Sequence, residues 1–336
     1  MILVILESVS TFYDSSSRVI LYPQKREKED TTHLTKSKSV MADNVLRVDT
    51  EPHIVANSSM VISKNSFSSK FRLIFLVGLE GTGHHYMADV LDRLCKISMI
   101  PCPNVCKMGK ALYPGLGAPE SANSYLAARR QLRQEMEYLA NTANRMEEGK
   151  ATMVGFGKCR NDMVGMMSYP NFNGIAKSVQ YVDFRILAEE AERAGVDLRI
   201  IYLSRPARDV IVSDTKHNNY GETFMMESRA LLANADVLVS TFRELGPGFV
   251  TCFYYDHITS EEQAERVADF VAPTEQLAHR FATRMVKSVR RPRRRQWSDK
   301  VDPYKDLWPS DSAKGLLVAR LQQKLNAIER DQCDLL

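Results

Sequence analysis

A chain of 336 residues with 44% hydrophobic and 26% charged residues has the composition of an ordinary globular protein, with room for one large domain or two small ones. Its net charge of +4 is too small to indicate nucleic-acid binding. No apolar run approaches the roughly 20 residues of a membrane span, and no signal-peptide pattern follows the apolar start, so we expect neither.

The cysteine content argues against two further classes of protein. Six cysteines are too sparse for a disulfide scaffold, and they lack the paired CxxC spacing of a structural zinc site. We therefore expect reduced thiols or one disulfide, and no bound metal.

The first 70 residues are rich in Ser, Thr, Lys, Asp and Glu without a helical or strand period, which predicts a disordered or loosely attached arm over 1–70. Met41 is a plausible alternative start to Met1. Order is expected from Phe71, because the apolar run 71–77 is typical of a strand buried on both faces of a parallel sheet.

Helices and strands alternate through the rest of the chain. After the first strand, apolar spacing predicts the helices 84–96 and 131–148, and 151–156 is a candidate second strand. The pattern then predicts, in order, the helix 182–194, the strand 198–203, the helices 207–216 and 222–245, and the strand 249–255.

A capping box of Thr259 and Glu262 is expected to open one more helix, which ends near Val271. Alternation of this kind predicts an α/β fold with a parallel sheet and helices on both faces. Ligands of such folds bind at the carboxyl ends of the strands.

The turn after the first strand carries three glycines in six residues, Gly78, Gly81 and Gly83, followed by a helix start. Such a turn can direct backbone N–H groups and the positive end of the helix dipole at a phosphate, as in a P-loop. The next two residues are His84 and His85, where a magnesium-dependent nucleotidase needs Lys and a hydroxyl. An unliganded glycine-rich turn is the alternative interpretation.

A second motif runs from Ile200 to Ser213. The strand delivers Arg205 at its carboxyl end, and Ser213 follows eight residues later on the next helix. An arginine and a hydroxyl brought together in this way can hold a second phosphate, the arginine through charge-assisted bonds.

Together these motifs resemble the sulfotransferase superfamily. There, a phosphate loop holds the 5′ end of 3′-phosphoadenosine 5′-phosphosulfate (PAPS), and a strand ending in Arg, followed by Asp-Val and Ser, holds its 3′-phosphate. The run Arg293-Arg294-Arg295 before Trp297 resembles the basic loop that closes over that phosphate. The resemblance implies PAPS as donor, no metal, and these cofactor-binding residues: Gly78, Gly81, Thr82, Gly83, His84, Arg205, Ser213, Arg293, Arg294 and Arg295.

Two departures from the family pattern concern catalysis. Gly81 stands where the family usually has Lys or Arg, and His84 and His85 replace hydroxyl residues. The candidate catalytic residues are Glu80, His84 and His85, with the choice of base open between Glu80 and His84. His217 is a further imidazole candidate, and Lys158 a candidate for the absent cation.

We therefore expect a P-loop-type, sulfotransferase-like α/β domain over 71–300 and a C-terminal helical extension over 301–336. The expected activity is sulfuryl transfer to a hydroxyl or amine, with a carbohydrate or protein acceptor favoured and no nucleic-acid partner. A P-loop kinase or NTPase, in which Asp256 would hold magnesium, and a non-catalytic nucleotide-binding module are the alternatives. The expected location is cytoplasmic by default, or the Golgi lumen if the protein has an N-terminal anchor that is missing from this chain.

Overall fold

The computed structural model describes residues 71–98, 102–103, 105, 108, 111, 122–145, 153–156, 171–173, 178–180, 184–217, 223–243, 245, 248–272, 275–289 and 312–333. The described elements all belong to one compact unit. The expected arm over 1–70, Lys158 and the basic run 293–295 lie outside the described residues.

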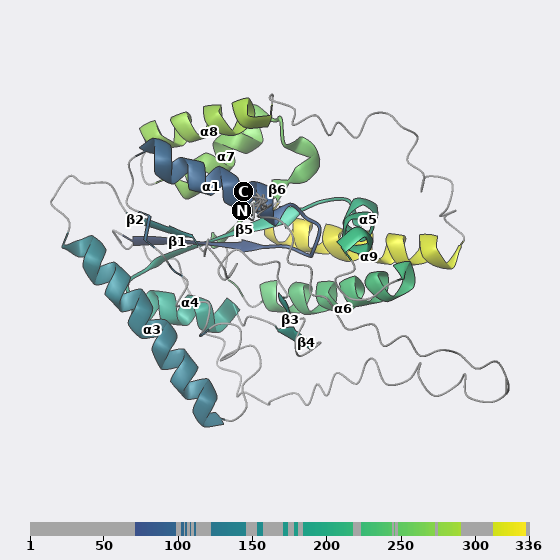
Figure 1. Cartoon of the computed structure of the whole chain (residues 1–336), viewed down its shortest axis with the longest axis horizontal. Coiled ribbons are helices and arrows are strands. Elements are labelled where there is room, and N and C mark those ends of the chain that lie inside the picture. Colours follow the sequence, from purple (N-terminus) through teal and green to yellow (C-terminus); the bar gives the residue numbers. More distant parts are fainter. Residues whose placement is uncertain are drawn as a thin grey trace, which may run out of the picture. The chain divides into compact units, whose positions relative to one another are not determined.

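Four parallel strands form the central sheet, in the order β2-β1-β5-β6 (Figure 1). They are β1 (Phe71–Val77), β2 (Met153–Phe156), β5 (Asp197–Ser204) and β6 (Val250–Tyr254). The predicted α/β class is thereby confirmed. Strands β3 (Asn171–Asn173) and β4 (Ser178–Gln180), which the sequence pattern did not predict, form a separate antiparallel pair.

The described helices are α1 (His84–Ser98), α3 (Ala122–Asn144), α4 (Phe184–Arg193), α5 (Ala207–His217), α6 (Phe224–Phe242), α7 (Glu261–Val271), α8 (Glu275–Val289) and α9 (Ala313–Gln332), with the 3₁₀ turn η2 (Tyr255–His257) after β6. None of them is long and apolar enough to cross a bilayer.

Successive residues of the strands face two separate cores, as the period of a strand requires. Phe75 and Tyr202 belong to the core that includes residues of α3, α4, α5, α6 and α9. Their neighbours Ile74 and Ile201 belong to the core formed with α1, α7 and α8. Figure 1 shows α1, α7 and α8 on one side of the sheet and α4 and α6 on the other. Helices therefore cover both faces, which confirms the prediction and explains why β1 is almost continuously apolar.

Two local predictions are corrected. The helix expected from residue 131 begins at Ala122, and Ala128 continues its buried stripe through a stretch whose apolar Leu126 is exposed. The cap of α7 is Ser260, whose hydroxyl accepts the N–H of Gln263 at 3.2 Å, and not Thr259 with Glu262. Both pairs have the capping-box spacing, so the sequence left the register uncertain by one residue.

The expectation of reduced thiols or one disulfide is also wrong. Cys252 of β6 is bonded to Cys333 at the end of α9, with 5.6 Å between their Cα atoms. Cys102 takes part in another disulfide. The Cys252–Cys333 pair spans 81 positions of sequence, so no local spacing could have indicated it. The bond ties α9, expected as an extension, to the central sheet.

Candidate anion-binding site

Three segments meet at the carboxyl ends of adjacent strands. The glycine-rich loop follows β1, the turn with Arg205 follows β5, and η2 follows β6. Since β5 lies between β1 and β6, its turn has a segment on either side. The parallel topology thus brings together residues that are more than 120 positions apart in sequence.

The loop itself is tightly closed. Thr82 donates both its N–H and its hydroxyl to the carbonyl of Leu79, at 3.2 and 2.7 Å. Gly81 and Gly83 have positive φ angles of 83° and 103°. A Cβ at Gly83 would lie 2.7 Å from carbon atoms of the Tyr255 ring. Backbone conformation and packing therefore account for these glycines, and the Thr82 hydroxyl donates inward.

Arg205 and Ser213 both reach this loop at Gly81. Arg205 donates from Nη1 to the carbonyl of Gly81 at 2.8 Å. A Cβ at Gly81 would lie 3.3 Å from the hydroxyl oxygen of Ser213, so that hydroxyl borders the loop directly. The two motifs that the sequence singled out separately therefore form one site.

The charge of Arg205 is only partly matched. Its side chain is 18% exposed, and its Nε lies 3.9 Å from the carboxylate of Asp209. That buried Nε has no hydrogen-bond partner. The guanidinium carbon stands 4.9 Å from the centre of the Tyr255 ring, a cation–π contact. The buried Nε of this partly exposed cation therefore has no acceptor beside the loop.

Asp256 is the second acid near this cation. Partial burial and the neighbouring Asp209 raise the pKa of Asp256 above its ordinary value, while Arg205 opposes the shift. The guanidinium of Arg205 therefore lies near two carboxylates and offsets part of the repulsion between them.

His84, the first residue of α1, is buried, with 5% of its surface exposed. One ring nitrogen is hydrogen-bonded to the backbone of Gly78, while Nε2 is buried without a partner. Burial, with a smaller effect of His85, lowers the pKa of His84 to about 3, so the ring is neutral at pH 7. A neutral ring that donates to Gly78 leaves Nε2 as a hydrogen-bond acceptor. This tautomer suits a hydroxyl group and does not suit a phosphate oxygen.

The other predicted site residues differ in how much the structure says of them. Glu80 of the loop is partly buried and has an interaction partner, and His85 is exposed. The side chain of His217 and the residues Arg293, Arg294 and Arg295 lie outside the described part of the chain.

Tyr255 is a site residue that the sequence did not single out. Its ring packs against Gly83 and Arg205 and meets Tyr86 edge-on at 6.1 Å. Its position directly after a buried strand was the available signal, because side chains there reach the edge of the sheet where ligands bind.

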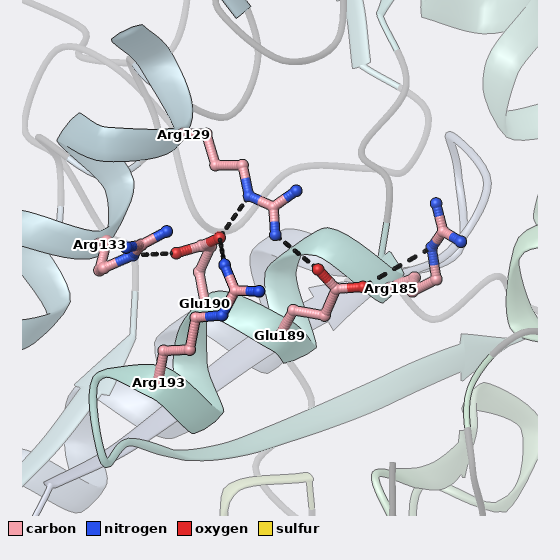
Figure 2. A network of polar contacts seen from close by, with 6 residues as sticks. All are labelled: Arg129, Arg133, Arg185, Glu189, Glu190 and Arg193. Atoms are coloured by element: carbon pink, nitrogen blue, oxygen red, sulfur yellow. Dashed lines mark hydrogen bonds and ion pairs between the residues drawn. The ribbon is translucent and has the colours of Figure 1, made fainter. Parts of the chain in front are cut away.

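A cluster of arginines away from this site joins α3 to α4, as Figure 2 shows. Glu190, which is completely buried, accepts bonds from Arg129, Arg133 and Arg193. Burial alone would raise the pKa of Glu190, but hydrogen bonds from the arginines outweigh it and hold the pKa below its ordinary value. Both carboxylate oxygens are occupied, so this cluster is a closed structural contact.

No family model matches the chain, and no curated protein is similar to it in sequence. Within the described ranges, no group of three or more His, Cys, Asp or Glu side chains is arranged to hold a metal ion.

Proposed function

We propose that the chain is a sulfotransferase-like enzyme that binds PAPS at the carboxyl edge of its sheet and transfers the sulfuryl group to a hydroxyl or amine. The observation that carries this proposal is the meeting of Arg205 and Ser213 at Gly81. This meeting supports the resemblance, because one site must hold both the 3′-phosphate and the 5′-phosphosulfate of PAPS, and the two motifs expected to hold them lie side by side.

The residues present fit a bisphosphate nucleotide. The unfilled Nε of Arg205 and the hydroxyl of Ser213 are donors for the 3′-phosphate. The N-terminus of α1 presents backbone N–H groups and the positive end of its dipole for the 5′ end. The packing that explains the glycines makes the loop rigid, and preorganised donors need no rearrangement when charge develops.

Sulfuryl transfer requires an acceptor oxygen or nitrogen in line with the sulfur, a base for its proton, and positive charge near the departing bisphosphate. Nε2 of His84 has the geometry of a proton acceptor, but a pKa of about 3 makes it a weak base. A phosphosulfate placed beside the ring would raise that pKa, because a neighbouring negative charge favours the protonated form. Glu80 stays the other candidate.

The missing loop cation supports a second candidate, a nucleotide-binding module without activity. Gly81 offers no positive charge, and its carbonyl is occupied by Arg205. A magnesium-dependent kinase is less well supported, because the side chain that reaches the loop from the neighbouring strand β5 is a cation. Asp256, the acid considered for magnesium, follows β6 instead.

The disulfides bear on the compartment and on the acceptor. Disulfides persist in oxidising compartments and are rare in the cytosol. The Cys252–Cys333 bond and the disulfide of Cys102 favour a luminal enzyme, such as one of the Golgi, over the cytoplasmic location expected from the sequence. Glycans and secreted proteins, the acceptors favoured from the sequence, are present in that compartment.

Calorimetric titration tests the proposal. We expect adenosine 3′,5′-bisphosphate to bind more tightly than ATP with magnesium, and Arg205→Ala and Ser213→Ala to weaken that binding. The matched controls are Arg280→Ala on the exposed face of α8 and Ser240→Ala on the exposed face of α6. Preference for magnesium ATP would contradict the proposal. Bisphosphate binding without transfer of labelled sulfate to a glycan or protein pool would favour the binding module.

A further inference from the structure

The C-terminal helix α9 is hydrogen-bonded to the chain on both sides of the turn that carries Arg205. Gln322 of α9 accepts the N–H of Ala207, the first residue of α5, at 2.9 Å. Glu329, two turns further along α9, accepts a hydrogen bond from the hydroxyl of Ser204, the last residue of β5. Between these two contacts lie only Arg205 and Pro206. The backbone on each side of the arginine is therefore held by one helix.

The contact with Gln322 replaces a local helix cap. The first N–H groups of a helix have no partner within the helix and usually bond to a side chain just before it. Pro206 precedes α5 and has no side-chain acceptor. Gln322 supplies that acceptor from a helix more than 100 positions later in the sequence.

Three further contacts keep α9 from moving independently of the sheet. Its Leu321, Leu325 and Ile328 are buried in the core that includes Tyr202. Gln332 donates to the carbonyl of Phe242 at 3.1 Å, and Cys333 is bonded to Cys252 of β6. A helix anchored in this way can fix the turn to the sheet.

We infer that α9 is a positioning element for the anion site, with Gln322 as its main positioning residue. The inference rests on the proposed function, in which Arg205 binds the 3′-phosphate. Within the described residues, Arg205 contacts Gly81, Tyr255 and Asp209, and Asp256 lies close enough to be affected by its charge. Its direction therefore depends on where β5 ends and α5 begins, which the two α9 side chains determine.

The test compares adenosine 3′,5′-bisphosphate with adenosine 5′-monophosphate as ligands of variants in α9. Gln322→Met fills a similar volume but cannot accept the Ala207 N–H. We expect the preference for the bisphosphate to fall about fivefold, the effect of one lost hydrogen bond. General destabilisation would not change the preference for one phosphate. Gln323→Met, at an exposed position of the same helix, is the matched control and should leave the preference unchanged.

Ser204→Ala removes the hydrogen bond to Glu329 and tests the inference independently. The inference is supported if either variant shows a lower preference for the bisphosphate over the monophosphate while Gln323→Met keeps the wild-type preference. A preference equal to that of the wild type in both Gln322→Met and Ser204→Ala overturns it and leaves the proposed function intact. A wild-type protein without any preference for the bisphosphate overturns the proposed function, and the inference with it.

Discussion

Two arginine-containing sites in this protein, a cluster around Glu190 and the single Arg205, differ in how completely their charges are matched. At the contact between α3 and α4, the buried Glu190 is bonded by Arg129, Arg133 and Arg193 (Figure 2). At the carboxyl edge of the sheet, Arg205 has one carbonyl bond and an acid 3.9 Å away. Residue type is the same in both places, so the number of partners distinguishes a structural contact from a site that can accept an anion.

The closed cluster should have the largest effect on stability. Glu190→Gln removes the charge that three guanidinium groups share, and we expect the free energy of unfolding to fall by about 3 kcal/mol. Urea unfolding measures this change. The exposed Glu192→Gln, on the same helix, should stay within about 0.5 kcal/mol of the wild type. If Glu190→Gln binds adenosine 3′,5′-bisphosphate with unchanged affinity, the Glu190 cluster is a structural contact only. If the variant is folded but no longer binds the bisphosphate, the cluster also takes part in binding, which would contradict the comparison.

The site around Arg205 should show the opposite pattern, with a large effect on binding and a small effect on stability. We expect Arg205→Ala to weaken binding of the bisphosphate about 50-fold, because a charge-assisted bond to phosphate is lost. Its free energy of unfolding should change by about 1 kcal/mol or less, since the arginine has few internal partners. Calorimetry and urea unfolding of the same preparation give both numbers. A large loss of stability at unchanged affinity would show that Arg205 is a structural residue after all.

The buried ring of His84 should make stability depend on pH. Its pKa of about 3 lies below the ordinary 6.5, so between these values the unfolded chain binds a proton that the folded chain does not. Its contribution is therefore complete above pH 6.5 and is lost as the pH falls, by up to about 1.4 kcal/mol per pH unit.

His84→Gln removes this contribution. The urea midpoint of the variant should fall less steeply between pH 6.5 and 4 than that of the wild type. His279→Gln, at an exposed position of α8, should keep the wild-type slope. If the slopes of the wild type and His84→Gln coincide, the ring is not held in its neutral form.

The smallest effect is expected at Ser213. Ser213→Ala removes one neutral donor, so binding of the bisphosphate should weaken about fivefold, with stability nearly unchanged. Binding of adenosine 5′-monophosphate, which has no 3′-phosphate, should be as tight to Ser213→Ala as to the wild type. An equal loss for both nucleotides would place the hydroxyl near the 5′ end instead.

Much of the fold could be predicted because local patterns determine it. The buried run of β1 and the apolar stripes of α1, α5 and α7 carry their own periodicity. The start of α3 was missed because its first turns have no regular apolar spacing that marks a buried face: Leu126 is exposed and Ala128 is buried. The bonds of α9 to Ser204 and Ala207, and its disulfide, join distant parts of the sequence, and no local pattern reveals such contacts.

The site was predictable to a similar degree. Arg205 and Ser213 were indicated by their places after a strand and on the next helix, and the structure brings both to Gly81. Glu190 was not predicted, because nothing local separates a buried glutamate from the exposed ones beside it on α4. The neutral state of His84 also follows from tertiary burial, which the sequence left open.

The most direct test of the central claim is a thermodynamic cycle between Arg205 and the 3′-phosphate of the ligand. Calorimetry would compare adenosine 3′,5′-bisphosphate with adenosine 5′-monophosphate on the wild type and on Arg205→Ala. We predict that the wild type prefers the bisphosphate by about 50-fold and that the variant shows almost no preference. A preference that survives unchanged in Arg205→Ala would contradict the claim that this arginine holds the 3′-phosphate.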